Sequence, residues 1–257
     1  MSTTNNTVLL TGESVLLPEL KELFAGKDYE VVTEKAVEND AKKIGLAVEV
    51  SNVDLELKKS VIQKLDRELP PDVPILTTSL GVSATEVASW TRHPERVCGF
   101  GTFRPLSERK LLELAPGLRT SMKTLKRAEA FFQSLGKNTA VVQDETGLVF
   151  PRVLSLIINE AVFAVMEGTA TPQDIDIAMK KGTNYPYGPL EWADQIGLDE
   201  VYAVIHGLHR DLAEERYRPA PLLRKMVLAG MLGVRSGEGF YTYSGETARP
   251  LTRGDER

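Results

Sequence analysis

The chain contains few of the side chains that commonly carry redox or metal chemistry. Its 257 residues include one cysteine and three histidines. With a single cysteine, Cys98, no intrachain disulfide is possible, and the apolar neighbours of Cys98 predict that it is a small buried hydrophobic residue. No cluster of His, Cys and carboxylates has metal-ligand spacing, so no metal is expected. No apolar run is long enough to span a bilayer, because the longest, at 153–166, is interrupted by three polar residues.

An excess of positive charge is also missing. The formal net charge is −5, which argues against a general nucleic-acid surface or an acidic membrane as partner. If the chain binds a phosphate group, a local set of donors must therefore hold it, because the protein as a whole carries no excess of positive charge. The first residues are polar and lack the basic flank and apolar run of a signal peptide, which predicts a cytoplasmic protein.

The first half of the chain alternates between strand-like and helix-like segments. Such alternation is typical of a parallel, doubly wound sheet. The strands are expected at 7–10, 29–32, 44–48, 73–78, 97–103 and 138–142, and the helices at about 18–24, 55–69, 84–91 and 122–135.

After 143–147 the pattern changes to helices almost throughout. Thr171 followed by Pro172 is a strong helix start, because Thr caps and proline fits the first turn. We therefore predict a Rossmann-like doubly wound α/β domain at 1–145, an all-α domain at 146–247 and a disordered tail at 248–257. The second domain is expected to have helices at 153–166, 172–182, 189–195, 199–215 and 221–232.

Several long motifs resemble one known family, the 3-hydroxyacyl-CoA dehydrogenases, and in particular the 3-hydroxybutyryl-CoA dehydrogenases. The likeness is densest in the second half and covers most of the chain. The motifs are Asp-Ile-Asp-Ile-Ala-Met-Lys-Lys-Gly at 174–182, Tyr-Pro-Tyr-Gly-Pro-Leu-Glu at 185–191, Ser-Gly-Glu-Gly-Phe-Tyr at 236–241, His-Pro-Glu-Arg-Val-Cys-Gly at 93–99 and Lys-Leu-Leu-Glu-Leu at 110–114.

The resemblance implies an NAD-dependent enzyme that oxidises a 3-hydroxyacyl-CoA in fatty-acid metabolism. It also implies a homodimer formed through the helical domain. Tyr185, Tyr187, Trp192 and the helix at 221–232 could supply apolar surface for that dimer. The same residues could equally belong to the core of a single chain.

The family's catalytic positions are altered here. The resemblance implies a histidine base oriented by a glutamate, with a serine and an asparagine positioning the substrate oxygen. The histidine position holds Gly101, the glutamate position holds Glu113, and the asparagine position holds Pro151. The serine position holds Leu80 in an ungapped match, whereas a shift of one residue gives Ser79. The candidate catalytic residues are therefore Glu113 and Ser79.

The cofactor turn is altered as well. In the family's glycine-rich motif the first glycine is Gly12, but the second position holds Ser14 and the third Leu17. Ser14 should narrow the approach of a diphosphate. The candidate cofactor residues are Gly12, Ser14, Lys58 and Thr78.

Two further departures lie nearby. The acid that the family uses on the adenosine ribose falls on Lys35. The stretch at 33–43 replaces a long helical excursion, so a wall of the acyl-CoA site should be shortened.

Three hypotheses follow. The first is a family member whose dehydrogenase activity is weak or lost, such as a non-catalytic dimer that binds an acyl-CoA-type ligand or a partner. The second is a fully active dehydrogenase with an atypical site. The third is a different reaction that uses Glu113, Arg104, Lys110 or Arg152. Loss of a general base typically costs a factor of roughly 10² to 10⁴ in rate, which favours the first.

Overall fold

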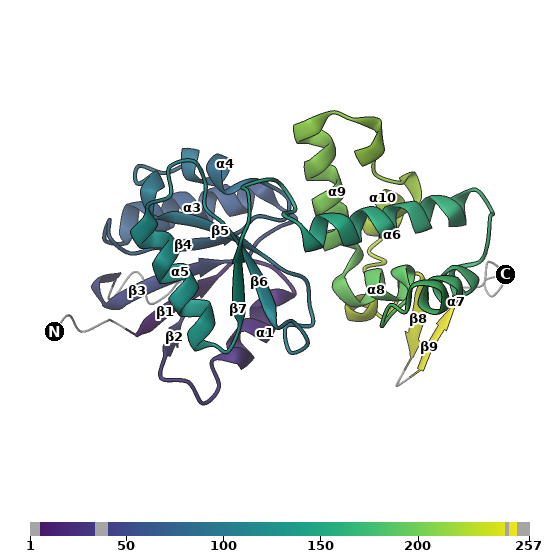
Figure 1. Cartoon of the computed structure of the whole chain (residues 1–257), viewed down its shortest axis with the longest axis horizontal. Helices are drawn as coiled ribbons and strands as arrows, with labels where there is room; N and C mark the ends of the chain where they lie inside the picture. Colours follow the sequence, from purple (N-terminus) through teal and green to yellow (C-terminus); the bar gives the residue numbers. More distant parts are fainter. Residues whose placement is uncertain (1–5, 34–40, 245–246, 251–257) are drawn as a thin grey trace. The chain divides into compact units, whose positions relative to one another are not determined.

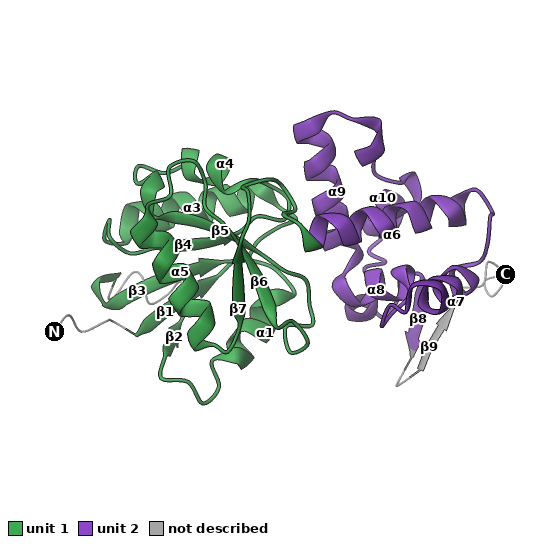
Figure 2. Cartoon of the chain, in the orientation of Figure 1, with its two compact units in different colours: residues 1–150 green, residues 151–257 purple. Residues whose placement is uncertain are grey.

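The computed structural model describes residues 6–33, 41–244 and 247–250, and it separates into two compact units (Figures 1 and 2). Unit 1 comprises Met1–Phe150 and unit 2 comprises Pro151–Arg257. This division falls a few residues after the predicted boundary at 145. Each unit is described below by itself.

Unit 1 is built on a seven-stranded sheet in the order β2-β1-β3-β4-β5-β6-β7. All neighbouring strands are parallel except β5 and β6, so the predicted parallel, doubly wound sheet is confirmed apart from one antiparallel pair. The strands are β1 (Thr7–Thr11), β2 (Glu30–Val32), β3 (Ile44–Glu49), β4 (Ile75–Thr78), β5 (Val97–Gly101), β6 (Leu111–Ala115) and β7 (Asn138–Val141).

Helices cover both faces of this sheet. Because side chains alternate along a strand, Val8 and Leu10 of β1 join the core under one helix pair, and Leu9 joins the core under the other. The first pair is α1 (Leu16–Leu23) and α5 (Met122–Ser134), and the second is α3 (Leu55–Glu68) and α4 (Ala84–Ser89).

The order of the strands reverses at β1. The chain leaves β1 for β2 on one side and then returns to form β3 on the other side. In open α/β sheets, ligands bind at such a point, beyond the carboxyl ends of the strands. The turn after β1 and the segment after β3 are therefore the places to look for a ligand.

Unit 2 is mainly helical, as predicted. Thr171 caps α7 by accepting a hydrogen bond from the Asp174 amide at 3.2 Å, and Asn184 ends it in the left-handed conformation. No helix among the described residues is long and apolar enough to cross a membrane. The helices are α6 (Phe150–Met166), α7 (Pro172–Thr183), α8 (Pro189–Ile196), α9 (Leu198–Leu212) and α10 (Pro221–Leu228).

Two buried aspartates hold the end of unit 2 together. Asp176 accepts hydrogen bonds from the amides of Leu190 and Glu191 and from the Tyr241 hydroxyl. Asp194 accepts from the amides of Phe240 and Tyr241 and from the Tyr243 hydroxyl. Burial raises the pKa of Asp194 to about 7, and these hydrogen bonds oppose that rise. The family-like motifs of this half therefore meet in one polar network.

The sequence prediction did not include the short hairpin that follows the helices of unit 2. Strand β8 (Tyr241–Ser244) pairs antiparallel with β9 (Thr247–Pro250), where disorder was expected from 248. Residues 251–257 lie outside the described residues. The hairpin forms because Tyr241 and Tyr243 anchor β8 to the buried aspartates.

Candidate functional site in unit 1

Four residues lie at one edge of the sheet, where strands β1, β3, β4 and β5 have their carboxyl ends. Gly12 follows β1, Ser51 follows β3, Thr78 ends β4 and Gly101 ends β5. This is the edge at which a doubly wound sheet binds ligands. Glu113 reaches the same edge from β6 because β6 runs antiparallel to β5 and pairs Glu113 with Gly101.

The pair of Gly101 and Glu113 occupies the place that the resemblance assigns to a histidine and its orienting acid. A Cβ atom added to Gly101 would lie 2.5 Å from Leu148 Cδ1 and 3.3 Å from Leu80 Cδ2. Both leucines are buried. The space beside Gly101 is thus filled by aliphatic side chains, which can neither give nor accept a proton.

Glu113 is engaged by backbone rather than by an imidazole. Its carboxylate oxygens accept hydrogen bonds from the amides of Val149 at 2.7 Å and Phe150 at 2.8 Å. These amides begin α6, where N–H groups have no partner within the helix. The carboxylate therefore satisfies two otherwise unpaired donors, with its charge at the positive end of the helix dipole.

Ser79, the other predicted catalytic residue, lies close to a different glycine. Its hydroxyl is fully buried and is 2.3 Å from where a Cβ on Gly99 would lie. The neighbour of Gly101 is Leu80, the residue that the ungapped match aligns with the family's serine. Ser79 Oγ is one of the buried side-chain atoms of the described structure that have no hydrogen-bond partner. A catalytic role for Ser79 stays a prediction.

Lys58 and Thr78, two of the predicted cofactor residues, belong to a buried polar network. Lys58 is completely buried, and its ammonium group donates to Glu49 Oε2 at 2.5 Å, to the Ser51 carbonyl at 2.8 Å and to Thr78 Oγ1 at 3.3 Å. Thr77 Oγ1 also donates to Glu49 Oε2, at 2.8 Å. An ammonium group has three donors, and these contacts use all three within the chain.

The turn after β1 is closed by hydroxyls of the chain. The Glu13 amide donates to Ser51 Oγ at 3.0 Å, and the Leu16 amide donates to Ser14 Oγ at 3.2 Å. Gly12 has a φ of +103°, and a Cβ there would lie 2.8 Å from the Ser51 amide nitrogen. The glycine is thus required by close packing of the turn against the end of β3.

These contacts test whether the turn fits the diphosphate of NAD. A diphosphate needs backbone N–H groups that point outward from a helix start. Here the amides of Glu13 and Leu16 already donate to serine oxygens, and Ser14 carries a side chain where the family has glycine. The turn as it stands does not fit a diphosphate bound in that manner. The ribose-binding position, Lys35, lies outside the described residues.

Two arginines considered for other chemistry, Arg104 and Arg152, and the histidine His206 interact with neighbouring side chains of their own units. Arg104 Nε donates to Glu19 Oε1 at 2.7 Å, which ties the loop after β5 to α1. In unit 2, Arg152 donates to the Tyr217 hydroxyl. His206 stacks on Tyr202 with ring centroids 5.5 Å apart, and burial lowers its pKa. No group of three or more His, Cys, Asp or Glu could hold a metal ion within the described part of the chain.

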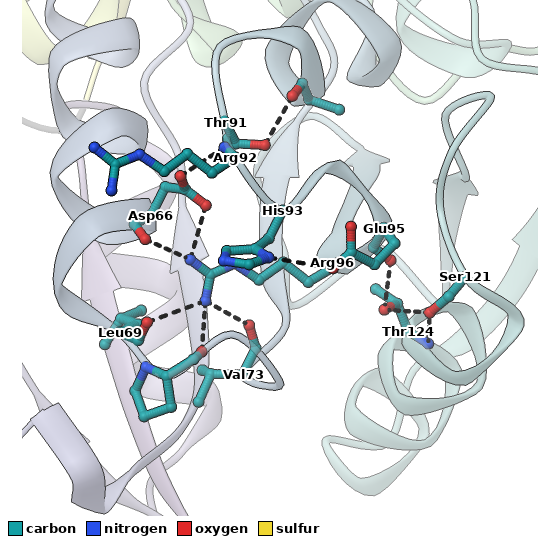
Figure 3. Close-up of polar contacts among 12 residues, drawn as sticks. Asp66, Leu69, Val73, Thr91, Arg92, His93, Glu95, Arg96, Ser121 and Thr124 are labelled. Carbon is teal, nitrogen blue, oxygen red and sulfur yellow. Dashed lines mark hydrogen bonds and ion pairs between the residues drawn. The ribbon is translucent and has the colours of Figure 1, made fainter.

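The family-like motif at 93–99 has a structural role, which Figure 3 shows. Arg96 is buried and donates to Asp66 Oδ1 at 2.9 Å and to the Pro70 carbonyl at 2.6 Å. The other oxygen of Asp66 accepts from the Arg92 amide at 2.7 Å. Burial alone would raise the pKa of Asp66, but these hydrogen bonds and the guanidinium hold it below its usual value. His93 is half exposed, beside Glu95.

Three residues that define this edge were not singled out from the sequence. They are Leu148, which fills the space at Gly101, Glu49, which pairs with Lys58, and Ser51, which closes the β1 turn. For Leu148 a signal was present, because it lies three residues before Pro151, the residue at the family's asparagine position. For Glu49 and Ser51 the sequence offered only their position just after the expected strand at 44–48.

Comparisons with known proteins agree with this architecture. Residues 147–243 match the family described as 3-hydroxyacyl-CoA dehydrogenase, C-terminal domain, and residues 19–145 match 3-hydroxyacyl-CoA dehydrogenase, NAD binding domain. A probable 3-hydroxybutyryl-CoA dehydrogenase of Bacillus subtilis is 40% identical over 209 residues, which cover 81% of this chain and 73% of the relative. A 3-hydroxybutyryl-CoA dehydrogenase of Bradyrhizobium diazoefficiens is 37% identical, with 83% and 72% covered.

A solved structure gives the same picture. The (S)-3-hydroxybutyryl-CoA dehydrogenase of Ralstonia eutropha superimposes with a TM-score of 0.77 at 31% identity. The superposition covers 93% of this chain and 99% of that one. The predicted architecture of a Rossmann-like domain followed by a helical domain is confirmed.

Proposed function

Because the chain belongs to the 3-hydroxyacyl-CoA dehydrogenase family, we propose that it is a member in which NAD-dependent oxidation of 3-hydroxyacyl-CoA is weak or lost. Unit 1 corresponds to the family's NAD-binding domain, and the family acts in acyl-CoA metabolism. An acyl-CoA-type molecule is the ligand class we assign to this chain.

One observation carries the proposal. The resemblance assigns the position of the family's base to Gly101, and the space into which a side chain would extend there is filled by Leu148 and Leu80. Oxidation of a hydroxyl requires a group that removes its proton as hydride leaves. Glu113, opposite Gly101, already accepts two backbone hydrogen bonds. Loss of the base alone lowers the rate by roughly 10² to 10⁴.

The test is a direct comparison of turnover. The full chain and the Bacillus subtilis relative are assayed side by side for NADH oxidation with acetoacetyl-CoA, by absorbance at 340 nm. We expect the chain to be at least about 10² slower at saturating substrate. A rate within tenfold of the relative would overturn the proposal and support the alternative, a fully active enzyme with an atypical site.

A matched set of variants connects the rate to the geometry. Gly101→His alone should not raise the rate of NADH oxidation, because the added side chain would clash with Leu148. Gly101→His combined with Leu148→Ala should exceed Leu148→Ala alone if space is what excludes the base. Equal rates for Gly101→His and the double variant would show that filled space is not the obstacle. Circular dichroism of each variant checks that it is folded.

We also propose that unit 2 forms a homodimer, through the face of α6 and α7. A hollow of about 540 Å³ on this face is lined almost wholly by apolar side chains. Val153, which lines this hollow, is 52% exposed. By contrast Trp192, one of the predicted interface residues, is buried against Tyr187, which favours its place in the core.

Light scattering after size exclusion tests the dimer. Val153→Glu should shift the chain toward monomer, because it places a charge in an apolar interface. Leu118→Glu is the control, since Leu118 is 91% exposed in unit 1. A monomeric wild-type chain at micromolar concentration contradicts the proposal. The cytoplasmic location expected from the sequence stays a prediction.

A further inference from the structure

The turn between β1 and α1 has a feature that the altered catalytic positions do not explain. Ser51 comes from the end of β3 and Ser14 from the turn itself, and each accepts a hydrogen bond from a backbone amide of the turn. The bond from Glu13 to Ser51 crosses the point where the strand order reverses. That is the position in which a doubly wound sheet holds a diphosphate.

The two serine oxygens accept hydrogen bonds from amides that a bound anion would otherwise use. Helix starts bind phosphate because their amides point outward and lack partners within the helix. Helix α1 has no side-chain cap at its N-cap residue, Val15, and Ser14 Oγ instead serves the Leu16 amide. The Ser14 carbonyl also accepts from the Leu17 amide, at 3.1 Å. Several donors of the turn are thereby satisfied inside the chain.

We propose that Ser14 and Ser51 form an internal cap that competes with the diphosphate of NAD for the amides of Glu13 and Leu16. In this arrangement the two hydroxyls lower the affinity of the chain for NAD. This inference rests on the proposed function only in taking NAD as the cofactor. The match to the NAD binding domain begins at residue 19, so this turn lies outside the matched residues.

If the two serines instead bind the diphosphate directly, replacing them should change the NADH affinity in the opposite direction. A hydroxyl can rotate and donate to a phosphate oxygen. If the serines serve NAD in that way, removing them will weaken binding. If they form an internal cap, removing them will strengthen binding, because the diphosphate no longer has to displace them. The sign of the change therefore decides between the two.

The experiment measures NADH affinity by fluorescence titration of the full chain. The proteins compared are wild type, Ser51→Ala, Ser14→Gly and the double variant. One hydrogen bond released is worth about 2- to 10-fold in affinity, so each single variant should bind NADH tighter by about that factor. The double variant should bind tighter than either. Hydrogen exchange should show faster exchange of the Glu13 and Leu16 amides in the double variant without NADH.

Ser121→Ala is the matched control. Ser121 accepts from the Thr124 amide at 3.1 Å as the cap of α5, so its loss costs a similar bond outside the turn. Its NADH affinity should equal that of wild type. Unchanged or weaker binding by Ser51→Ala and the double variant overturns the inference. Because the readout is binding, a fast wild-type dehydrogenase would refute the proposed function without deciding this comparison.

Discussion

Replacing Glu113 by glutamine should destabilise unit 1 substantially, although the two side chains have nearly the same shape. Both carboxylate oxygens of Glu113 accept backbone hydrogen bonds, from the amides of Val149 and Phe150, and the residue is 6% exposed. In Glu113→Gln, one of these oxygens becomes an NH₂ group, which is a donor. One buried amide then faces a donor instead of an acceptor.

The cost can be built from two parts. A buried N–H left without an acceptor costs about 1–3 kcal/mol. Removing the negative charge from the start of α6 costs about 0.3–1 kcal/mol more, through the helix dipole. The free energy of unfolding should therefore fall by about 1.3–4 kcal/mol. At roughly 2–4 °C per kcal/mol for a domain of this size, the Tm of unit 1 should fall by about 3–16 °C.

The assay is differential scanning calorimetry of the full chain, together with hydrogen exchange at Val149 and Phe150. Asp144→Asn is a second test of the same principle, because Asp144 accepts from the amides of Ala84 and Thr85 at 2.7 Å each. Glu68→Gln, at an exposed position, is the negative control. A Tm within about 1 °C of wild type, with unchanged exchange at both amides, would refute the capping role of Glu113.

Three further predictions concern other buried groups. Lys58→Met should cost about 3–5 kcal/mol in thermal unfolding, because it leaves Glu49 charged and buried, and Glu49→Gln in the same chain should recover much of that loss. Burial raises the pKa of Asp194 to about 7, so the folded state holds this proton more tightly than the unfolded state does, and the free energy of unfolding should fall as pH rises from about 4 to about 7. Asp194→Asn should flatten this pH dependence, and an unaltered slope would contradict the assignment. Burial raises the pKa of the Cys98 thiol to about 12, so iodoacetamide should label Cys98 only in denaturant, and labelling of the native chain within minutes would count against this.

Much of the fold could be predicted from local patterns. A continuous apolar run such as Val8, Leu9 and Leu10 indicates a strand buried on both faces, and Thr171 with Pro172 fixes the start of α7. Strand β6 was missed because its five residues, with the charged Glu113 in the middle, give no clear periodic signal. The β8–β9 hairpin was missed because it depends on Asp176 and Asp194, which are distant in sequence.

The candidate site was less predictable, because its geometry depends on contacts between segments far apart in the chain. The sequence indicated that Gly101 lacks a proton-transfer group, but not that Leu148 fills the space. It indicated Lys58 as a cofactor residue, but not that its donors are all used inside the chain, on Glu49, Ser51 and Thr78. Residue types can be read from a motif, whereas the partners of those residues cannot.

The filled space beside Gly101 and the role of Glu113 are two parts of one arrangement. A side chain on Gly101 would enter the volume of Leu148, and overpacking of a core costs about 1–3 kcal/mol. Leu148 has a φ of +54° and lies directly before the two amides that Glu113 binds. The glutamate thus holds the segment whose leucine fills the space beside Gly101. A histidine there would have to displace the leucine and compete with two amides for the carboxylate. Restoring the family's chemistry therefore requires at least the pair of changes at Gly101 and Leu148, and one substitution alone is expected to cost stability without returning a rate.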